Sequence, residues 1–282
     1  MLAPNVHDLL NSKMPDVIHL ECGPLRARTT VSTADIRKAQ SFRARFFALN
    51  KSADADAFDA SSIHLLVEDH AQGILVACCR LKVFEPEELT SSYSGQFYDL
   101  SRLQHFPGRM IEIGRFCVDP VQRSPDILRL TWALIAKIVD TCDVELMFGC
   151  SSFPGTGAEP HRASFDMLFA RYRAPDVWRP CEKSKDIVRF HKTGDISSCN
   201  FEKGWAGTPS LLRTYLAMCA WVSDHAVVDY NLNTLHVFTG VEIAKIPPMR
   251  KKQLRQLLRD QAVQLLSHEP GLKAVDAKRA SA

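Results

Sequence analysis

Apolar residues recur along this chain with two different spacings, and the first clear pattern is helical. Residues 33 to 50 place apolar side chains on one face of a helix, with Ser32 or Thr33 as the candidate N-cap. That face consists of Ile36, Ala39, Phe42, Phe46 and Phe47. The pattern predicts an amphipathic helix, preceded by a loose leader over residues 1 to 20.

Strand-like patterns follow this helix. The apolar runs 62 to 69 and 73 to 84 predict two strands joined by a turn at Gly73. A polar, serine-rich excursion from 85 to 105 separates them from a further strand at 109 to 119.

The second half of the chain alternates between helix and strand. Pro125 suits the first turn of a helix that runs from Ser124 to about Thr141 with one apolar face. The remaining patterns predict a buried strand at 144 to 153, helices at 158 to 173 and 210 to 222, and strands at 225 to 230 and 234 to 243.

Helices that alternate with strands after an antiparallel beginning predict an α/β fold: one mixed sheet with helices on both faces. The order of elements is typical of the acyl-transferring fold built around a split sheet. A doubly wound nucleotide-binding fold is the alternative. We expect a single folded domain over residues 21 to 246, followed by a basic amphipathic helix and tail over 247 to 282.

Composition narrows the class of protein. The chain has 282 residues, of which 46% are apolar and 24% charged, and this composition is that of a globular protein. A formal charge of +3 gives no argument for a nucleic-acid partner. The first residues do not match the pattern of a signal peptide, so none is expected, and no 18-residue apolar run predicts a membrane span. Nine cysteines without a C-x-x-C pair predict no metal site and fit a reduced cytoplasmic interior.

The segment "EIGRFCVDPVQRS" (112 to 124) carries a strand through a basic loop into the helix that begins near Pro125. A loop of this kind usually binds phosphate, because backbone N–H groups and the helix dipole favour an anion there. Phosphate-binding loops, however, normally contain glycine. This loop has none, so a nucleotide is a poor ligand for it.

Three stretches of the chain carry a resemblance to a known family: "FRARFF…DADAFD…HLLV", "EIGRFCVDP…LMFGCSSFPGT" and "TPSLLRTYLAMCAWVSDHAVVDYNLNTLHVFTGVE". They resemble the L-ornithine N-alpha-acyltransferases of bacterial ornithine-lipid synthesis. These enzymes are relatives of the acyl-homoserine-lactone synthases in the Gcn5-related N-acetyltransferase (GNAT) superfamily. The resemblance covers roughly residues 40 to 245. It departs at Phe116, where a serine is common, and before His64, where a cysteine-aspartate pair is often found.

The resemblance implies a split, mixed sheet of the GNAT type. It also implies transfer of a 3-hydroxyacyl group from acyl carrier protein to the alpha-amine of L-ornithine, giving lyso-ornithine lipid. The co-substrate is then the acyl-phosphopantetheine thioester, with no other cofactor. Such a carrier presents no nucleotide diphosphate, which fits the glycine-free "QRSPD" loop, although coenzyme A stays open as a donor.

The resemblance also assigns catalytic residues. Glu112 on the central strand is the expected base, and its alternative is a structural ion pair with Arg115 or another arginine. The superfamily carries a bulge on this strand, which implies a free backbone N–H among Phe116 to Val118 to polarise the thioester carbonyl. We assign that role to Val118. Tyr172 matches the tyrosine that protonates the leaving thiolate, and packing at a helix end is the alternative.

Six further residues match positions shared with the lactone synthases: Arg43, Phe47, Asp56, Asp59, Arg80 and Arg115. An arginine of this set is expected to hold the alpha-carboxylate of the amino acid in bidentate fashion. Asp56 and Asp59 either hold the side-chain ammonium or brace the arginines.

Other polar residues have simpler interpretations. Cys117 and Cys150 lack a base partner and are expected to be small buried residues, and His64 and His236 are expected to be core histidines. The stretch from 221 to 234 is polar enough to line the acceptor pocket or to form a turn network. Its candidate residues are Ser223, Asp224, His225, Asp229 and Asn231.

The basic tail carries Arg250, Lys251, Lys252, Arg255 and Arg259 beside a helical apolar stripe. An acidic carrier protein and an anionic membrane surface both fit it, as does a solvated helix packed on the body. The protein is expected in the cytoplasm; the membrane alternative for this helix implies peripheral contact with the inner face of the cytoplasmic membrane. The rival functions are acylation of glutamine, lysine or glycine, lactone synthesis, and non-catalytic binding of a carrier or lipid.

Overall fold

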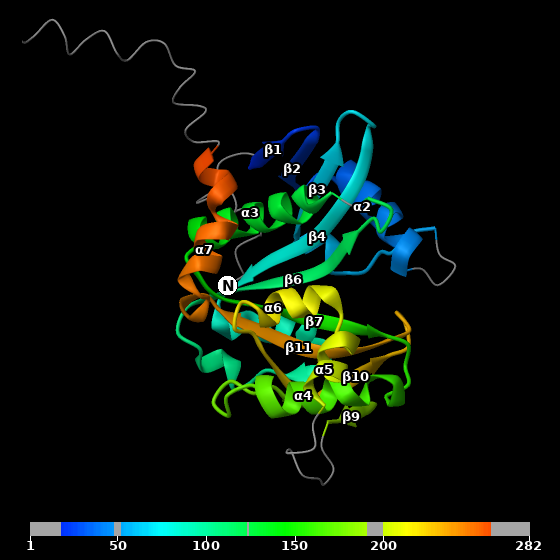
Figure 1. Ribbon diagram of the computed structural model, residues 1–282, viewed down its shortest axis with the longest axis vertical. Helices are drawn as coiled ribbons and strands as arrows, with labels where there is room; N and C mark the ends of the chain where they lie inside the picture. Colours follow the sequence, from blue (N-terminus) through cyan, green and yellow to red (C-terminus); the bar gives the residue numbers. More distant parts are fainter. Residues whose placement is uncertain (1–17, 48–51, 123, 191–199, 261–282) are drawn as a thin grey trace, which may run out of the picture.

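The computed structural model describes residues 18–47, 52–122, 124–190 and 200–260. A mixed sheet runs through it in the order β1-β2-β3-β4-β6-β7-β11-β10-β9 (Figure 1). These strands are β1 (His19–Cys22), β2 (Leu25–Thr30), β3 (Ile63–Asp69), β4 (Ile74–Phe84), β6 (Arg109–Val118), β7 (Val144–Pro154), β9 (Ile187–Arg189), β10 (Trp221–Asp229) and β11 (Thr234–Glu242). The short strands β5 (Tyr98–Asp99) and β8 (Cys181–Glu182) form a separate pair.

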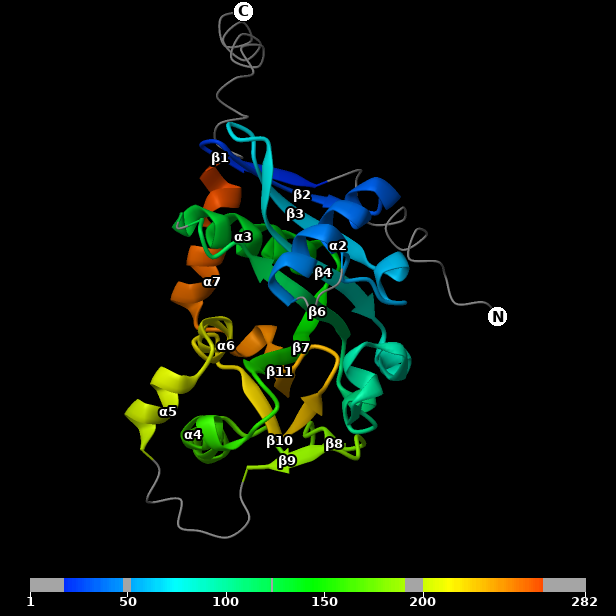
Figure 2. The same ribbon diagram turned by 90° about the vertical axis from the view of Figure 1, so that its right-hand side faces the viewer.

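Helices cover both faces of the sheet (Figures 1 and 2). They are α2 (Thr33–Phe47), α3 (Pro125–Thr141), α4 (Arg162–Tyr172), α5 (Phe201–Gly207), α6 (Ser210–Leu216) and α7 (Pro248–Leu254). Leu66 of β3 packs with α2, whereas its neighbours Leu65 and Val67 belong to the core cluster that contains α3. Successive strand residues point to opposite faces, so α2 and α3 lie on opposite sides of the sheet.

The sheet splits between β6 and β7. These two strands pair in parallel only from Arg109 to Glu112, where Glu112 lies opposite Phe148. Beyond that point they diverge, as Figure 1 shows for the pairs β4–β6 and β7–β11. Gly149 lies at the divergence, and a Cβ atom there would come within 2.3 Å of the Ile113 carbonyl oxygen. The absence of a side chain therefore lets the two backbones approach at the point where they part.

A bulge interrupts β6 directly after the split. Before the shift, Gly114 lies opposite Arg80 of β4, and after it, Cys117 lies opposite Cys78. Between these two pairs, β6 has one residue more than β4. Arg115 takes up the extra residue with φ 52°, a left-handed conformation that is unusual for a side chain of its size. The bulge brings Glu112 and Arg115 to the same side of the strand, although they are three residues apart.

Most predicted elements are confirmed. The helix from 33, the strand pair around Gly73, the strand from 109, the helix capped by Ser124 and the strands near 144 and 234 all form as expected. The mixed sheet with helices on both faces is confirmed as well. Residues 48 to 50, at the end of the first predicted helix, lie outside the described residues.

The predicted helix at 210 to 222 is wrong in its second half. Helix α6 ends at Leu216, Cys219 has φ 63°, and Trp221 already belongs to β10. The apolar run continues from helix into strand, so hydrophobicity alone does not mark the boundary. The sequence patterns also missed β1, β2 and α5. His19 and Leu20, placed in the predicted leader, belong to β1, and residues 1–17 lie outside the described residues.

We expect Gly149→Ala to lower the free energy of unfolding by about 1–3 kcal/mol, because the new methyl group must push β7 away from Ile113. Urea denaturation measures this change. Gly157→Ala is the matched control, since nothing lies within 4 Å of a Cβ atom at that position. Equal unfolding midpoints for the two variants would contradict the close approach of the Gly149 and Ile113 backbones.

Candidate active site

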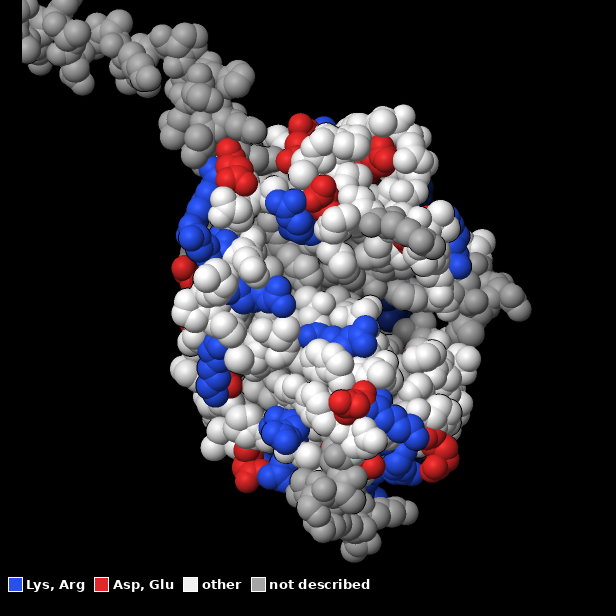
Figure 3. Space-filling view, in the orientation of Figure 1, with Lys and Arg blue, Asp and Glu red and all other residues white. Residues whose placement is uncertain are grey.

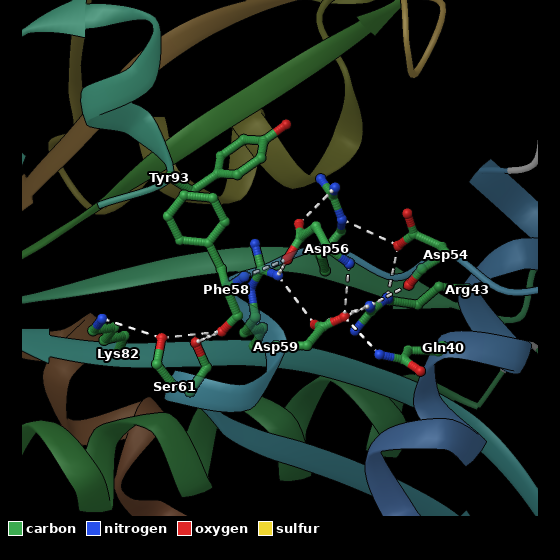
Figure 4. Close-up of polar contacts among 12 residues, drawn as sticks. Gln40, Arg43, Asp54, Asp56, Phe58, Asp59, Ser61, Lys82 and Tyr93 are labelled. Carbon is green, nitrogen blue, oxygen red and sulfur yellow. Dashed lines mark hydrogen bonds and ion pairs between the residues drawn. The ribbon is translucent and has the colours of Figure 1, made fainter. Parts of the chain in front are cut away.

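An ion-pair network joins α2, the loop after it, β4 and β6 (Figure 4). Arg43 of α2 is completely buried. Its Nε lies 2.8 Å from Asp54 Oδ2, and its Nη2 lies 3.0 Å from Asp59 Oδ2. Gln40 adds a hydrogen bond to Asp59 at 2.8 Å. Arg43 therefore fixes the loop that carries both aspartates.

Two further arginines complete the network. Arg80 Nη1 contacts Asp56 Oδ1 and lies 3.0 Å from Asp59 Oδ1. Arg115 Nη2 lies 3.0 Å from Asp56 Oδ2, and its Nε lies 3.1 Å from Asp54 Oδ2. Three guanidinium groups and three carboxylates thus balance in charge, and each is tied to at least two partners.

The neighbouring arginines keep the buried carboxylate of Asp59 ionised. Burial alone would raise the pKa of Asp59, but the charges of Arg43 and Arg80 and the hydrogen bond from Gln40 outweigh it. The pKa of Asp59 is consequently held below its usual value, and the carboxylate stays ionised. Of the two roles predicted for Asp56 and Asp59, bracing the arginines is the one that their contacts support.

Tyr93 connects this network to the rest of the site. Its ring lies over the guanidinium groups of Arg115 and Arg80, with 4.9 and 5.6 Å from Cζ to the ring centroid. The phenol oxygen lies 3.3 Å from Asp229 Oδ2 on β10. One aromatic ring therefore separates the arginines from an acidic group on the far half of the sheet.

Glu112 accepts three hydrogen bonds from the segment that precedes it. Tyr93 N donates to Oε2 at 3.0 Å, and Ser94 donates to Oε1 through its N at 2.7 Å and its Oγ at 2.6 Å. Within the described ranges no lysine or arginine makes an ion pair with Glu112. Burial raises the pKa of Glu112 above 4.5, although the hydrogen bonds from Ser94 and Tyr93 oppose the shift. A buried carboxylate with a raised pKa is suited to accept a proton.

A cavity of about 450 Å³ opens where β6 and β7 part. Glu112, Arg115 and Tyr93 line one side of it. The other side is formed by apolar residues of the core around α3 and α6: Phe116, Met147, Leu212, Tyr215 and Val241. The cavity therefore reaches both faces of the sheet through the split, with a charged half and an apolar half.

A backbone donor faces the same gap. Asp119 N donates to Val76 O at 2.9 Å, so Asp119, directly after β6, and Val76 of β4 are a hydrogen-bonded pair. In the same register Val118 lies opposite Ala77, the next pair along the ladder. Hydrogen-bonded and non-hydrogen-bonded pairs alternate in an antiparallel ladder. The N–H of Val118 therefore points away from β4, to the side from which β7 has departed.

Four of the predicted site residues line the cavity: Phe47, Arg80, Glu112 and Arg115. Arg43, Asp56 and Asp59 support these residues from behind and are not part of the lining. Val118 is not part of the lining either; its side chain packs against the core and its N–H points to the gap between β6 and β7.

Tyr172 ends α4, which packs against β10, and contacts the apolar core away from the cavity lining. The structure places Tyr215 rather than Tyr172 in the cavity wall. Tyr172 is thus not brought together with the other predicted residues, and its placement favours the packing alternative.

Cys117, His64 and His236 are buried, whereas Cys150 is half-buried and lines the cavity. Burial raises the pKa of Cys117 to about 12 and also raises that of Cys150, so neither thiol is ionised at neutral pH. His64 Nε2 lies 3.0 Å from the carbonyl oxygen of Asp59. His236 is buried as expected, and it also contributes to the cavity lining.

Comparisons with known proteins agree with this geometry. A family model described as an acetyltransferase (GNAT) domain matches residues 38–133. The chain is 31% identical over 248 residues to the L-ornithine N(alpha)-acyltransferase of Rhizobium meliloti, covering 79% of this chain and 81% of that protein. The chain belongs to the L-ornithine N(alpha)-acyltransferase family.

A second relative supports this assignment. The protein of the same name from Brucella abortus is 30% identical over 79% of this chain and 86% of its own length. Among solved structures, the chain is similar to FeeM, an N-acyl amino acid synthase from uncultured soil microbes. The TM-score is 0.44 at 8% identity, over 78% of this chain and 92% of that chain. The family model and the named relatives show that the protein is an acyltransferase with a GNAT-type fold, as the sequence resemblance indicated.

Sequence reasoning missed several residues of this acyltransferase site. Tyr93 lies in the polar excursion and carries no periodic signal, while Asp54 shares the "DADAFD" segment with the predicted aspartates. Within the described part of the chain, no group of metal-ligating side chains is assembled and no helix has the length and hydropathy to cross a membrane.

Proposed function

We propose that this acyltransferase moves a 3-hydroxyacyl group from acyl carrier protein to the alpha-amine of L-ornithine, giving lyso-ornithine lipid. The cavity through the split sheet carries this proposal, because it offers a charged half for an amino acid and an apolar half for an acyl chain. The names of the relatives support ornithine as the acceptor.

The reaction is aminolysis of a thioester. The alpha-amine loses a proton to Glu112, directly or through water, and attacks the thioester carbon. The Val118 N–H stabilises the negative charge that develops on the carbonyl oxygen. The new C–N bond forms as the C–S bond breaks, and the pantetheine thiol leaves with a proton. Arg115 lines the charged half and is placed to hold the alpha-carboxylate of the acceptor.

The start of α3 supports a donor without a nucleotide. The N-cap Ser124 hydroxyl already accepts from the Asp126 N–H at 3.3 Å, and Pro125 has no N–H to offer. Fewer free donors remain for a pyrophosphate than at a glycine-rich helix start. Arg123 of the "QRSPD" loop lies outside the described residues.

A basic groove beside α3 fits an acidic carrier protein. The space between α3, α6 and α7 has a volume of about 500 Å³ and is rimmed by Arg129, Arg250 and Lys252 around exposed Leu128 and Met249. Figure 3 shows basic side chains along the edge formed by α7. Trp132 forms part of this groove, and its ring lies 5.4 Å from that of Tyr215 in the cavity wall. A carrier seated in the groove would present its thioester close to the apolar half.

The residues that follow α7 also pack against the folded domain. Arg255 Nε lies 2.7 Å from Asp140 of α3, and Leu257 is buried. The membrane contact predicted for the basic C-terminal helix stays a prediction, because Ala262, Leu265 and Leu266 of its apolar stripe lie outside the described residues.

An acylation assay tests the proposal. Purified enzyme is combined with 3-hydroxyacyl carrier protein or the matching coenzyme A thioester, and with a panel of amino acids. Mass spectrometry then identifies the product. We expect hydroxyacyl-ornithine, with kcat/KM at least 10-fold higher for the carrier protein. Product on another amino acid would overturn the acceptor, and equal use of coenzyme A would overturn the donor. No product with any acceptor would favour a binding protein.

A further inference from the structure

Resting on the proposed function, we propose that Asp229 and His236 form the binding site for the side-chain ammonium of the acceptor amino acid. Both residues lie on the hairpin formed by β10 and β11, and both line the charged half of the cavity. Val227 pairs with His236 in that hairpin, so Asp229, two residues after Val227, points to the same face as His236. The sequence named Asp229 among the residues that line the acceptor pocket or form a turn network, and it placed His236 in the core.

Asp229 is a buried carboxylate that makes no ion pair with any lysine or arginine in the described part of the chain. Its side chain is only 4% exposed. Oδ1 accepts from the N–H groups of Asn231 and Leu232 at 2.9 and 3.0 Å, which fixes the turn after β10. Oδ2 lies 3.3 Å from the Tyr93 hydroxyl and has capacity for another donor.

This situation differs from that of the three aspartates on the opposite side of Tyr93, although Glu112 likewise has no cationic partner among the described residues. Asp54, Asp56 and Asp59 are each paired with arginine at the opposite side of Tyr93. A buried carboxylate without a cation is costly, and a bound ammonium group removes that cost. The unpaired charge of Asp229 therefore indicates a cationic ligand rather than a neutral one.

His236 supplies a second acceptor next to Asp229. The Tyr98 hydroxyl has one proton, which it donates to the His236 carbonyl oxygen at 2.8 Å. The contact of 3.2 Å between the Tyr98 oxygen and His236 Nδ1 then requires a proton on Nδ1. Nε2 is left as a lone-pair acceptor; it is buried and has no hydrogen-bond partner among the described residues. Burial lowers the pKa of His236 to about 4, so the ring is neutral at physiological pH.

The position of Tyr93 sets the distance between the two ends of the acceptor. On one side its ring covers Arg115, which is placed to hold the alpha-carboxylate, and on the other its hydroxyl meets Asp229. An amino acid with a carboxylate at one end and an ammonium group a few methylenes away matches this arrangement of charges. Glu112, which also lines the cavity, is then left to accept the proton of the alpha-amine.

The arrangement predicts selectivity for diamino acids. Norvaline has the carbon chain of ornithine without the side-chain ammonium, so its binding leaves Asp229 unpaired. We expect kcat/KM for ornithine to exceed that for norvaline by at least about 100-fold, because a buried charge without its partner is strongly unfavourable. Lysine, longer by one methylene, is expected to be intermediate.

The test compares ornithine and norvaline as acceptors for the wild-type enzyme and for Asp229→Asn, with the same acyl carrier protein donor. The variant should raise the KM for ornithine about 30-fold or more and reduce the ornithine-to-norvaline ratio of kcat/KM to below 10. The KM for the acyl carrier protein should stay within about 2-fold. His236→Phe, which removes the acceptor nitrogen, should shift the ratio in the same direction.

Asp224→Asn is the matched control. Asp224 lies on the same strand and contacts His225 and Arg179, and it is not part of the cavity lining. This variant should retain the wild-type ratio. Equal losses with ornithine and norvaline in Asp229→Asn would overturn the proposal by showing a merely structural role. A wild-type enzyme that acylates only neutral amino acids would instead refute the proposed acceptor, so the two failures can be told apart.

Discussion

Glu112→Gln should lower kcat by at least about 100-fold, because the amide cannot take the proton that the amine must lose. The acid limb of the pH profile should disappear in this variant as well. In the wild-type enzyme, activity should fall as the pH drops through the pKa of Glu112, which burial raises above 4.5. Steady-state kinetics with ornithine and a saturating acyl carrier protein donor, measured from acidic to neutral pH, check both effects.

A structural role for Glu112 makes a different prediction, because its carboxylate also ties down the segment that carries Tyr93. Ser94→Ala is the appropriate comparison. It removes the hydroxyl that donates to Glu112 at 2.6 Å and leaves the carboxylate in place. If Glu112 is the base, Ser94→Ala keeps most of the activity and the acid limb. Similar losses in the two variants, with an unchanged pH profile, would show that Glu112 acts only as a tether.

Arg43→Met should lower the free energy of unfolding by about 3–5 kcal/mol, because it removes one of the two arginines that pair with Asp54 and with Asp59 and leaves the network with an uncompensated negative charge. The methionine fills much of the same volume, so the loss reports on charge more than on packing. For a chain of this size the change corresponds to a fall in Tm of about 10 °C. Urea denaturation and differential scanning calorimetry measure the two quantities.

The same helix provides the control for this prediction. Arg45 is two residues further along α2, its side chain is 60% exposed, and it pairs with Asp119 at 3.3 Å. Arg45→Met should cost less than about 1 kcal/mol, as exposed ion pairs usually do. A small cost for Arg43→Met as well would mean that the network contributes little to stability.

The contrast between Arg43 and Arg115 shows how one network serves both folding and function. Arg43 is not part of the cavity lining and forms ion pairs with the loop aspartates, whereas Arg115 lines the cavity. The two share Asp54, so a change at Arg43 is expected to disturb the orientation of Arg115. Binding of the acceptor carboxylate thus depends on a residue that does not touch the cavity.

Local sequence patterns were sufficient for most elements of the fold. The apolar face of α2, the N-cap at Ser124 with Pro125 after it, and the strands on both sides of Gly73 depend on neighbours within a few residues. These preferences do not need the rest of the protein. Where a helix and a strand share one apolar run, as before Trp221, the periodicity did not predict the end of the helix. Hydrophobicity alone does not distinguish helical from extended backbone there.

Family motifs in the sequence determined the class of enzyme and the candidate residues, including Glu112, Arg80 and Arg115. Only the tertiary structure decided how they are used. Four features depend on contacts between residues far apart in the chain. They are the strand split at Gly149, the bulge at Arg115, the pairing of the three loop aspartates with arginines, and the carboxylate of Asp229 without a cationic partner. The sequence determines which charged residues are present. Which of them remain without a partner depends on distances between side chains, and these are set only when the chain folds.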